Sequence, residues 1–210
     1  MEITRIEEIT GSRSKVYIDE EFAFVLYKGE LRHYKLTVGE EVTEETYHDI
    51  VNVLLVKRAK RRSMALLKSR PYTEKQMYDK LKQGFYPESA ISQAILYLES
   101  YGYLDDARYA QDYIDYHKET KSRRRLEQDL LGKGIAKSVI AEAFREWEEQ
   151  GNEIEEADQI ARWIRKKSYD IRTNDPKEKQ KMAAFLFRKG FAVSNIQKAL
   201  QYDGSQEMFP

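Results

Sequence analysis

Apolar residues recur at helical spacing in the middle of the chain. Ile91, Ala94, Ile95 and Leu98 stand at positions i, i+3, i+4 and i+7, which places them on one face of a helix. Gly102 follows this stripe, and a helix commonly ends next to a glycine in the left-handed conformation. The pattern therefore predicts a helix that ends just before Gly102.

A second helix is predicted directly after this stop. Tyr103 and Leu104 form an apolar step. Asp105 suits the N-cap position because its carboxylate can accept an unpaired backbone N–H, and negative charge on Asp106 is favoured by the helix dipole. The inward face of this helix is predicted to carry Tyr109, Ala110, Tyr113 and Ile114.

Three glycines mark an internal repeat. Gly84, Gly134 and Gly190 each lie three residues after an apolar residue and are each followed by an isoleucine and an alanine. This register requires one extra residue around Tyr86 and Pro87 in the first unit. A spacing of about fifty residues suits a three-helix unit. We expect units at residues 57–104, 105–151 and 152–203, followed by a tail at 204–210.

The first 56 residues are expected to form a small β-rich subdomain. Strand character is found in a run with Ile3 and Ile6, and in residues 15–18 and 22–27. The connection at residues 19–21 contains no glycine, so we expect it to be longer or looser than a tight hairpin turn. So small a sheet should pack on the next predicted helix, for which Thr43 is a candidate N-cap and which has no clear end before Pro71.

The predicted fold is therefore mainly α-helical. We expect tandem three-helix repeats in an extended, curved array, preceded by the β-rich subdomain. The apolar stripes of the helices supply their cores, and the units should stack on their neighbours because a core of this size is small.

Composition narrows the chemistry that the chain can perform. It has 210 residues, no cysteine and three histidines that lie far apart in sequence, so thiolate zinc sites and cysteine nucleophiles are excluded. No stretch approaches the roughly 18 apolar residues of a membrane span, and the N-terminus does not resemble a signal peptide. We expect a cytoplasmic protein that does not associate with a membrane.

The net charge is zero, with 36 basic and 36 acidic residues, but the distribution is uneven. Residues 1–56 hold 6 Lys and Arg against 12 Asp and Glu, whereas basic residues cluster further on. Such clusters can bind phosphate groups or acidic protein surfaces, or can simply be solvated or paired with the acidic subdomain. The candidate partner-binding or DNA-binding residues are Lys57, Arg58, Lys60, Arg61, Arg62, Arg123, Arg124, Arg125, Arg165, Lys166, Lys167, Arg188 and Lys189.

Little in the sequence favours an enzyme. Asp105 and Asp106 can be read as a metal-binding pair for phosphodiester cleavage, but adjacent helical positions do not face each other, and helix capping accounts for both. No phosphate-binding or nucleophile motif is present, and no cofactor is expected. The helix–turn–helix corners of the repeats also permit a second reading, a helical protein that binds DNA by itself.

The chain resembles the RecX regulatory family over nearly all of its length. The resemblance rests on residues 66–74, on Lys80-Leu81 with Gly84-Phe85, and most specifically on residues 101–110. Residues 130–135 and 188–191 fall where that family places its other repeats, and residues 16–24 resemble the β-rich extension of longer members. Glu20 or Glu21, and Ser122, stand where glycine is common in the family.

The resemblance implies a regulator rather than an enzyme. Members of the family bind the filament that the RecA recombinase forms on single-stranded DNA. They restrain its ATP hydrolysis, strand exchange and SOS coprotease activity. We accordingly expect RecA as the partner, DNA itself as a second partner, and a monomeric protein without cofactors.

Overall fold

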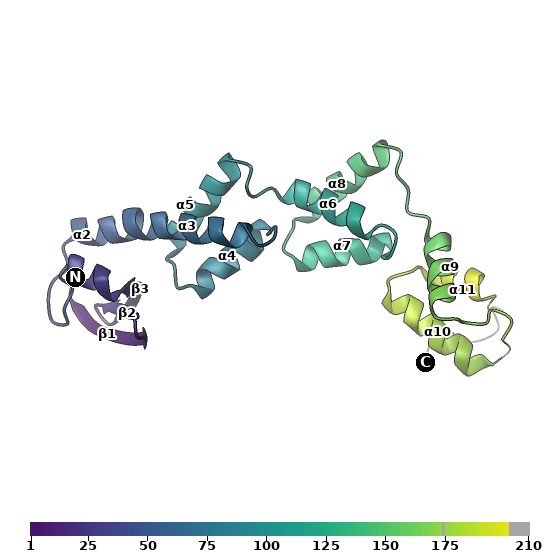
Figure 1. The fold of residues 1–210 in the computed structure, drawn as a ribbon, viewed down its shortest axis with the longest axis horizontal. Coiled ribbons are helices and arrows are strands. Elements are labelled where there is room, and N and C mark those ends of the chain that lie inside the picture. Colours follow the sequence, from purple (N-terminus) through teal and green to yellow (C-terminus); the bar gives the residue numbers. More distant parts are fainter. Residues whose placement is uncertain (174, 202–210) are drawn as a thin grey trace. The chain divides into compact units, whose positions relative to one another are not determined.

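The computed structural model describes residues 1–173 and 175–201, so the tail expected at residues 204–210 lies outside the described part. The chain divides into two compact units, one from Met1 to Asp105 and one that begins at Asp106 (Figure 1). The first unit contains β1 (Ile3–Thr10), β2 (Arg13–Ile18), β3 (Glu21–Tyr27), α1 (Lys28–His33), α2 (Glu44–Asp49), η1 (Ile50–Leu54), α3 (Leu55–Leu67), α4 (Glu74–Gln83) and α5 (Glu88–Ser100). The second contains α6 (Asp106–His117), α7 (Arg123–Gly132), α8 (Lys137–Glu149), α9 (Glu156–Lys166), α10 (Pro176–Arg188) and α11 (Val193–Leu200).

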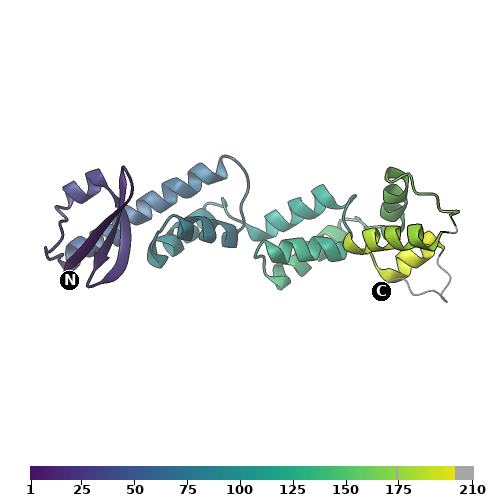
Figure 2. The ribbon, with the colours of Figure 1, turned by 90° about the horizontal axis from the view of Figure 1, so that it is seen from below.

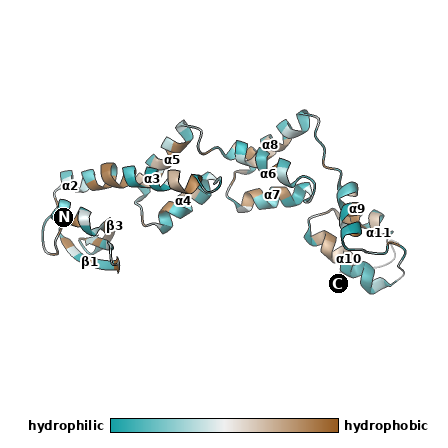
Figure 3. Cartoon of the chain, viewed as in Figure 1, coloured by the Kyte–Doolittle hydropathy of each residue, from teal (hydrophilic) through white to brown (hydrophobic). Residues whose placement is uncertain are grey.

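These elements confirm the mainly helical fold with three-helix repeats and a small N-terminal sheet. The first repeat is built from α3, α4 and α5, the second from α6, α7 and α8, and the third from α9, α10 and α11. Each repeat has its own cluster of buried apolar side chains, and the sheet has a fourth. Along the helices, apolar positions alternate with polar ones, as Figure 3 shows by hydropathy.

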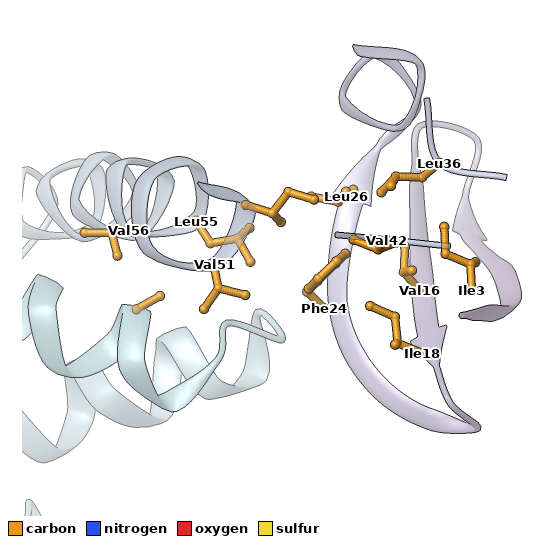
Figure 4. Close-up of a cluster of buried hydrophobic side chains, with 12 residues drawn as sticks. Ile3, Val16, Ile18, Phe24, Leu26, Leu36, Val42, Val51, Leu55 and Val56 are labelled. Atoms are coloured by element: carbon orange, nitrogen blue, oxygen red, sulfur yellow. The ribbon is translucent and has the colours of Figure 1, made fainter. Parts of the chain in front are cut away.

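The N-terminal sheet is antiparallel, in the order β1-β2-β3. It packs on the helical segment formed by η1 and α3 (Figure 2). Phe24 and Leu26 of β3 share one buried cluster with Val51 and Leu55 of the helix (Figure 4). Phe24 and Leu26 are fully buried. The helix therefore supplies the apolar surface that a three-stranded sheet cannot supply alone.

The connection between β2 and β3 is tighter than the sequence predicted. Asp19 and Glu20 alone join the strands, with φ angles of 49° and 68°. The expectation of a loose connection was wrong because Glu2 and Thr4, at the start of the chain, support the turn. Asp19 Oδ1 accepts a hydrogen bond from the Glu2 N–H (2.8 Å), and the Glu20 N–H donates to Thr4 Oγ1 of β1 (3.0 Å). These contacts offset the cost of the left-handed conformation.

One continuous helical segment links the sheet to the first repeat. Thr43 caps it as predicted, with Oγ1 accepting from the Thr46 N–H at 3.2 Å, and the segment runs through α2, the π-helical η1 and α3 to Leu67. The expected boundary between residues 56 and 57 thus falls inside a helix. Val56 belongs to the core of the sheet, and Ala59 to the core of the first repeat.

The turn between the second and third helices of each repeat corrects the register predicted from the glycines. Tyr86, Ile135 and Phe191 donate their N–H to the carbonyls of Leu81, Leu130 and Leu186, at 3.3, 3.2 and 3.4 Å. In this register no extra residue is needed in the first repeat. These three leucines are buried. Leu131 and Phe187, the apolar residues three positions before Gly134 and Gly190, are exposed.

Phe85 causes the shift. It adopts a φ of 64° at the position where Gly134 and Gly190 have 90° and 91°. Gly84 itself has a φ of −79°, and a Cβ there would lie 3.0 Å from the Tyr86 ring. Position 84 therefore needs a glycine because a side chain would be too close to Tyr86, and not because its backbone is left-handed.

The loop between α6 and α7 carries the contacts between the second and third repeats. Gln159 donates to the carbonyls of Lys118 and Lys121, the latter at 3.0 Å, and Trp163 Nε1 donates to the Thr120 carbonyl at 3.3 Å. Ser122 caps α7 by accepting from the Arg125 N–H at 3.3 Å, and its hydroxyl donates to the Lys189 carbonyl at 3.4 Å. Ser122, at a position where the family often has glycine, therefore caps α7 and also binds the third repeat.

Gly190 provides a test of this contact. A Cβ on Gly190 would lie 2.7 Å from Ser122 Oγ and 3.0 Å from Arg125 Cβ, and its φ is +91°; Gly151 has a similar φ of +82° but nothing within 4 Å. We expect Gly151→Ala to cost about 1–2 kcal/mol from backbone strain, and Gly190→Ala about 2–4 kcal/mol because overpacking is added. Urea unfolding followed by circular dichroism measures both; equal losses would contradict the close approach at Gly190.

Candidate interaction surfaces

The first basic cluster lies on α3, and most of it is solvent-accessible. Lys57, Arg61 and Arg62 are exposed and Lys60 is half-buried, and for these four the described residues contain no ion pair. Positions i, i+4 and i+11 of a helix share a face, so Lys57 and Arg61 align with Lys68. A shallow groove on this face, here called the α3 surface, is lined by Lys57, Lys60, Arg61, Met64, Ala65, Lys68 and Tyr97.

Arg58 is separate from this surface and has a structural role. Its guanidinium donates to the Val25 carbonyl at 2.6 Å and pairs with Glu30 at 3.0 Å, and its side chain is 18% exposed. It also lies over the ring of Tyr27, 4.9 Å from the centroid. Arg58 thus joins α3 to the sheet and to α1.

The three arginines of α7 are divided between internal pairing and solvent. Arg123 pairs with Glu127 at 3.1 Å and with Glu148, and Arg125 pairs with Asp129 at 3.0 Å. Arg124 is exposed, and no ion pair is found for it among residues 1–173 and 175–201. The cluster therefore offers fewer available charges than its sequence indicates.

The basic clusters at residues 165–167 and 188–189 lie beside a pair of aromatic rings. Trp163 of α9 and Phe185 of α10 contact edge to face, with centroids 5.4 Å apart. Lys166 Nζ lies 5.1 Å from the Trp163 ring, Lys167 Nζ 5.0 Å from Phe185, and Lys189 Nζ 4.6 Å from Trp163. These five residues are called the Trp163 cluster. Arg165 and Arg188 are exposed on the same two helices.

A partly buried polar network lies beside the α7 arginines. Lys121 Nζ donates to the Tyr113 hydroxyl at 2.7 Å and to Asp129 at 2.9 Å, and Tyr113 donates to Asp129 at 3.1 Å. Burial alone raises the pKa of the Asp129 carboxyl, but hydrogen bonding and charge from Lys121 outweigh it, so this pKa lies below its usual value. The network therefore requires an ionised Asp129.

Asp105 and Asp106, considered from the sequence as a possible metal-binding pair, lie at the start of a helix. α6 begins at Asp106, so Asp105 directly precedes its first residue. Within the part of the chain that the structure describes, no group of three or more His, Asp or Glu side chains is placed to hold a metal ion. The carboxylates at this junction thus have the position that capping requires.

Sequence reasoning missed several residues of these surfaces. Lys68 and Tyr97 line the α3 surface, and Trp163 and Phe185 hold the lysines of the third repeat. Helical spacing from Lys57 and Arg61 would have found Lys68. The other three required knowledge of which helices pack together, which no local pattern contains.

Comparison with known proteins accounts for the repeats. Residues 59–98, 105–143 and 153–200 match the first, second and third three-helix domains of RecX. The regulatory protein RecX of Caldanaerobacter subterraneus subsp. tengcongensis is 34% identical over 202 residues, which cover 95% of this chain and 98% of that protein. The chain belongs to the RecX family. A second RecX regulatory protein, from Bacillus pumilus, is 30% identical over 98% of this chain and 79% of its own length.

A solved structure supports the same assignment. A crystal structure of regulatory protein RecX aligns with a TM-score of 0.59 and 25% identity, covering 96% of this chain and 99% of that one. The fold of this chain is therefore similar to that of the solved RecX structure over nearly the whole length of both chains. Among its described residues, no helix is sufficiently long and apolar to cross a membrane.

The unfolding free energy of two variants can distinguish an arginine of α3 that stabilises the fold from one that is exposed to solvent. Arg58→Met removes the hydrogen bond to the Val25 carbonyl and the ion pair with Glu30, so we expect a loss of about 1–3 kcal/mol in unfolding free energy. Arg61→Met, on the same helix and exposed, should change stability by less than about 0.5 kcal/mol. Urea midpoints of the two variants decide; a destabilised Arg61→Met with an unaffected Arg58→Met would reverse the assignment.

Acid titration tests the Asp129 network. Because the folded pKa of Asp129 is below its unfolded value of about 3.9, its ionisation stabilises the fold above that pH, and the contribution is lost as pH falls through the folded pKa. We expect Asp129→Asn to be less stable than the parent protein at pH 7, and the difference to shrink below about pH 4. A stability difference that is constant from pH 7 to pH 3 would contradict this role.

Proposed function

We propose that this protein binds the RecA filament on single-stranded DNA and restrains its activities, including ATP hydrolysis. The observation that carries the proposal is the match of all three repeats to the RecX regulatory family. The protein acts by binding rather than by catalysis. In keeping with this partner, it functions in the cytoplasm, as a monomer and without a cofactor.

Basic side chains on successive repeats support this proposal. The α3 surface, Arg124 and the Trp163 cluster lie on the first, second and third repeats. A filament presents the same surface at regular intervals, so several weak contacts on one chain can add to a strong attachment. The proposed contact residues are Lys57, Lys60, Arg61, Arg62, Arg124, Arg165, Lys166, Lys167, Arg188 and Lys189.

Direct binding of DNA is the alternative function. The Trp163 cluster favours it, since lysines beside aromatic rings suit a nucleic-acid backbone. This function would be marked by RecA-independent binding whose affinity falls steeply with salt, because counterions are released when phosphates are neutralised.

The deciding experiment measures ATP hydrolysis by RecA on single-stranded DNA while this protein is added well below the RecA concentration. We expect the rate to fall, because one chain attached to a filament affects several protomers. An unchanged rate, combined with salt-sensitive binding to DNA alone, would favour the alternative function instead.

Charge reversal at Arg124 tests the contribution of the second repeat. Arg124 is exposed and forms no ion pair with the residues that the structure describes. Arg124→Glu should therefore raise the amount of protein needed for half-maximal inhibition several-fold while leaving the helical content unchanged. Lys80→Glu is the matched control, since Lys80 is exposed on α4, outside the basic clusters. Equal effects of the two variants would show that only overall charge matters.

A further inference from the structure

The α3 surface combines an apolar floor with a basic rim. Met64 and Tyr97 are partly buried and continue into the core of the first repeat, and Ala65 lies exposed between them and the solvent. Lys57 and Lys68 stand at the two ends of the groove. α3 carries no acidic residue, so nothing on this helix neutralises the rim.

The aromatic ring in the floor is already engaged. Lys60 Nζ lies 4.5 Å from the centroid of Tyr97, and the Tyr101 ring lies 4.8 Å from it at an angle of 50°. A nucleic-acid base needs an open aromatic face on which to stack. The floor is instead suited to a flexible aliphatic or aromatic side chain, which methionine accommodates well.

The dimensions of the groove limit the length of a bound segment. Lys68 lies eleven positions after Lys57, which corresponds to a helical rise of about 16 Å. An extended peptide covers this distance in about five residues. A segment with carboxylates at both ends and an apolar side chain between them would therefore match the rim and the floor at once.

We propose that the α3 surface docks an acidic protein segment of this kind, with carboxylates on Lys57 and Lys68 and an apolar side chain against Met64, Ala65 and Tyr97. The inference rests on the proposed function only in treating this surface as a contact site. It specifies the chemistry of the protein that occupies it.

The test uses a labelled six-residue peptide with a glutamate at each end and leucine and phenylalanine at its centre, which separates the two glutamates by about 16 Å when extended. Fluorescence anisotropy should show binding that weakens at least tenfold when the central pair is replaced by serines, or when the glutamates are replaced by glutamines. Neither RecA nor DNA is present, so a failure here is distinguishable from a failure of filament regulation.

Variants of the protein locate the binding. Ala65→Glu places a carboxylate on the exposed floor, and Lys57→Glu with Lys68→Glu reverses the rim; each should reduce peptide affinity at least tenfold. Lys80→Glu, with the same charge change on α4, should bind the peptide nearly as the parent does. Circular dichroism checks that all three fold.

Three results would overturn the inference. The first is the absence of peptide binding, and the second is peptide binding that the floor and rim substitutions do not affect. The third concerns a labelled oligothymidylate. If it binds the parent protein and loses affinity in the floor and rim variants, while the affinity of the peptide is unchanged in those variants, the surface would be assigned to nucleic acid.

Discussion

The hydrogen bond that closes the turn between the second and third helices organises every repeat. It joins the N–H of Tyr86, Ile135 or Phe191 to the carbonyl of a buried leucine in the preceding helix. The leucine carbonyl also accepts the N–H of Gly84, Lys133 or Lys189 at the helix end. The second bond turns the chain so that the next residues enter the same core. The core of each repeat depends on this reversal, because three short helices have little other apolar surface to share.

Small separate cores explain why polar contacts are prominent between neighbouring elements. Arg58 ties the sheet to α3, and Gln159, Trp163 and Ser122 tie the third repeat to the loop after α6. These groups bind backbone carbonyls, which keeps buried acceptors satisfied where apolar packing is thin. A basic or polar residue in this protein can therefore serve structure as readily as it serves a partner.

This distinction changes how the basic clusters are interpreted. Arg123 and Arg125 resemble Arg124 in sequence, but they pair with carboxylates of α7 and α8. The available charges are distributed over the three repeats rather than concentrated in one cluster. A distribution of this kind suits a regulator that attaches through several modest contacts and that must also dissociate.

The three-helix repeats, the small sheet and the cap at Thr43 could be predicted before the structure was known, because they follow from the spacing of residues close together in the chain. The family resemblance also came from local motifs such as residues 101–110. Other features became visible only in the folded chain. They are the tight turn at Asp19 and Glu20, the left-handed conformation of Phe85, the structural role of Arg58 and the position of Lys166 and Lys189 beside the same Trp163 ring. Each of these depends on contacts between residues far apart in sequence, whose energies outweigh the local preferences from which a sequence is interpreted.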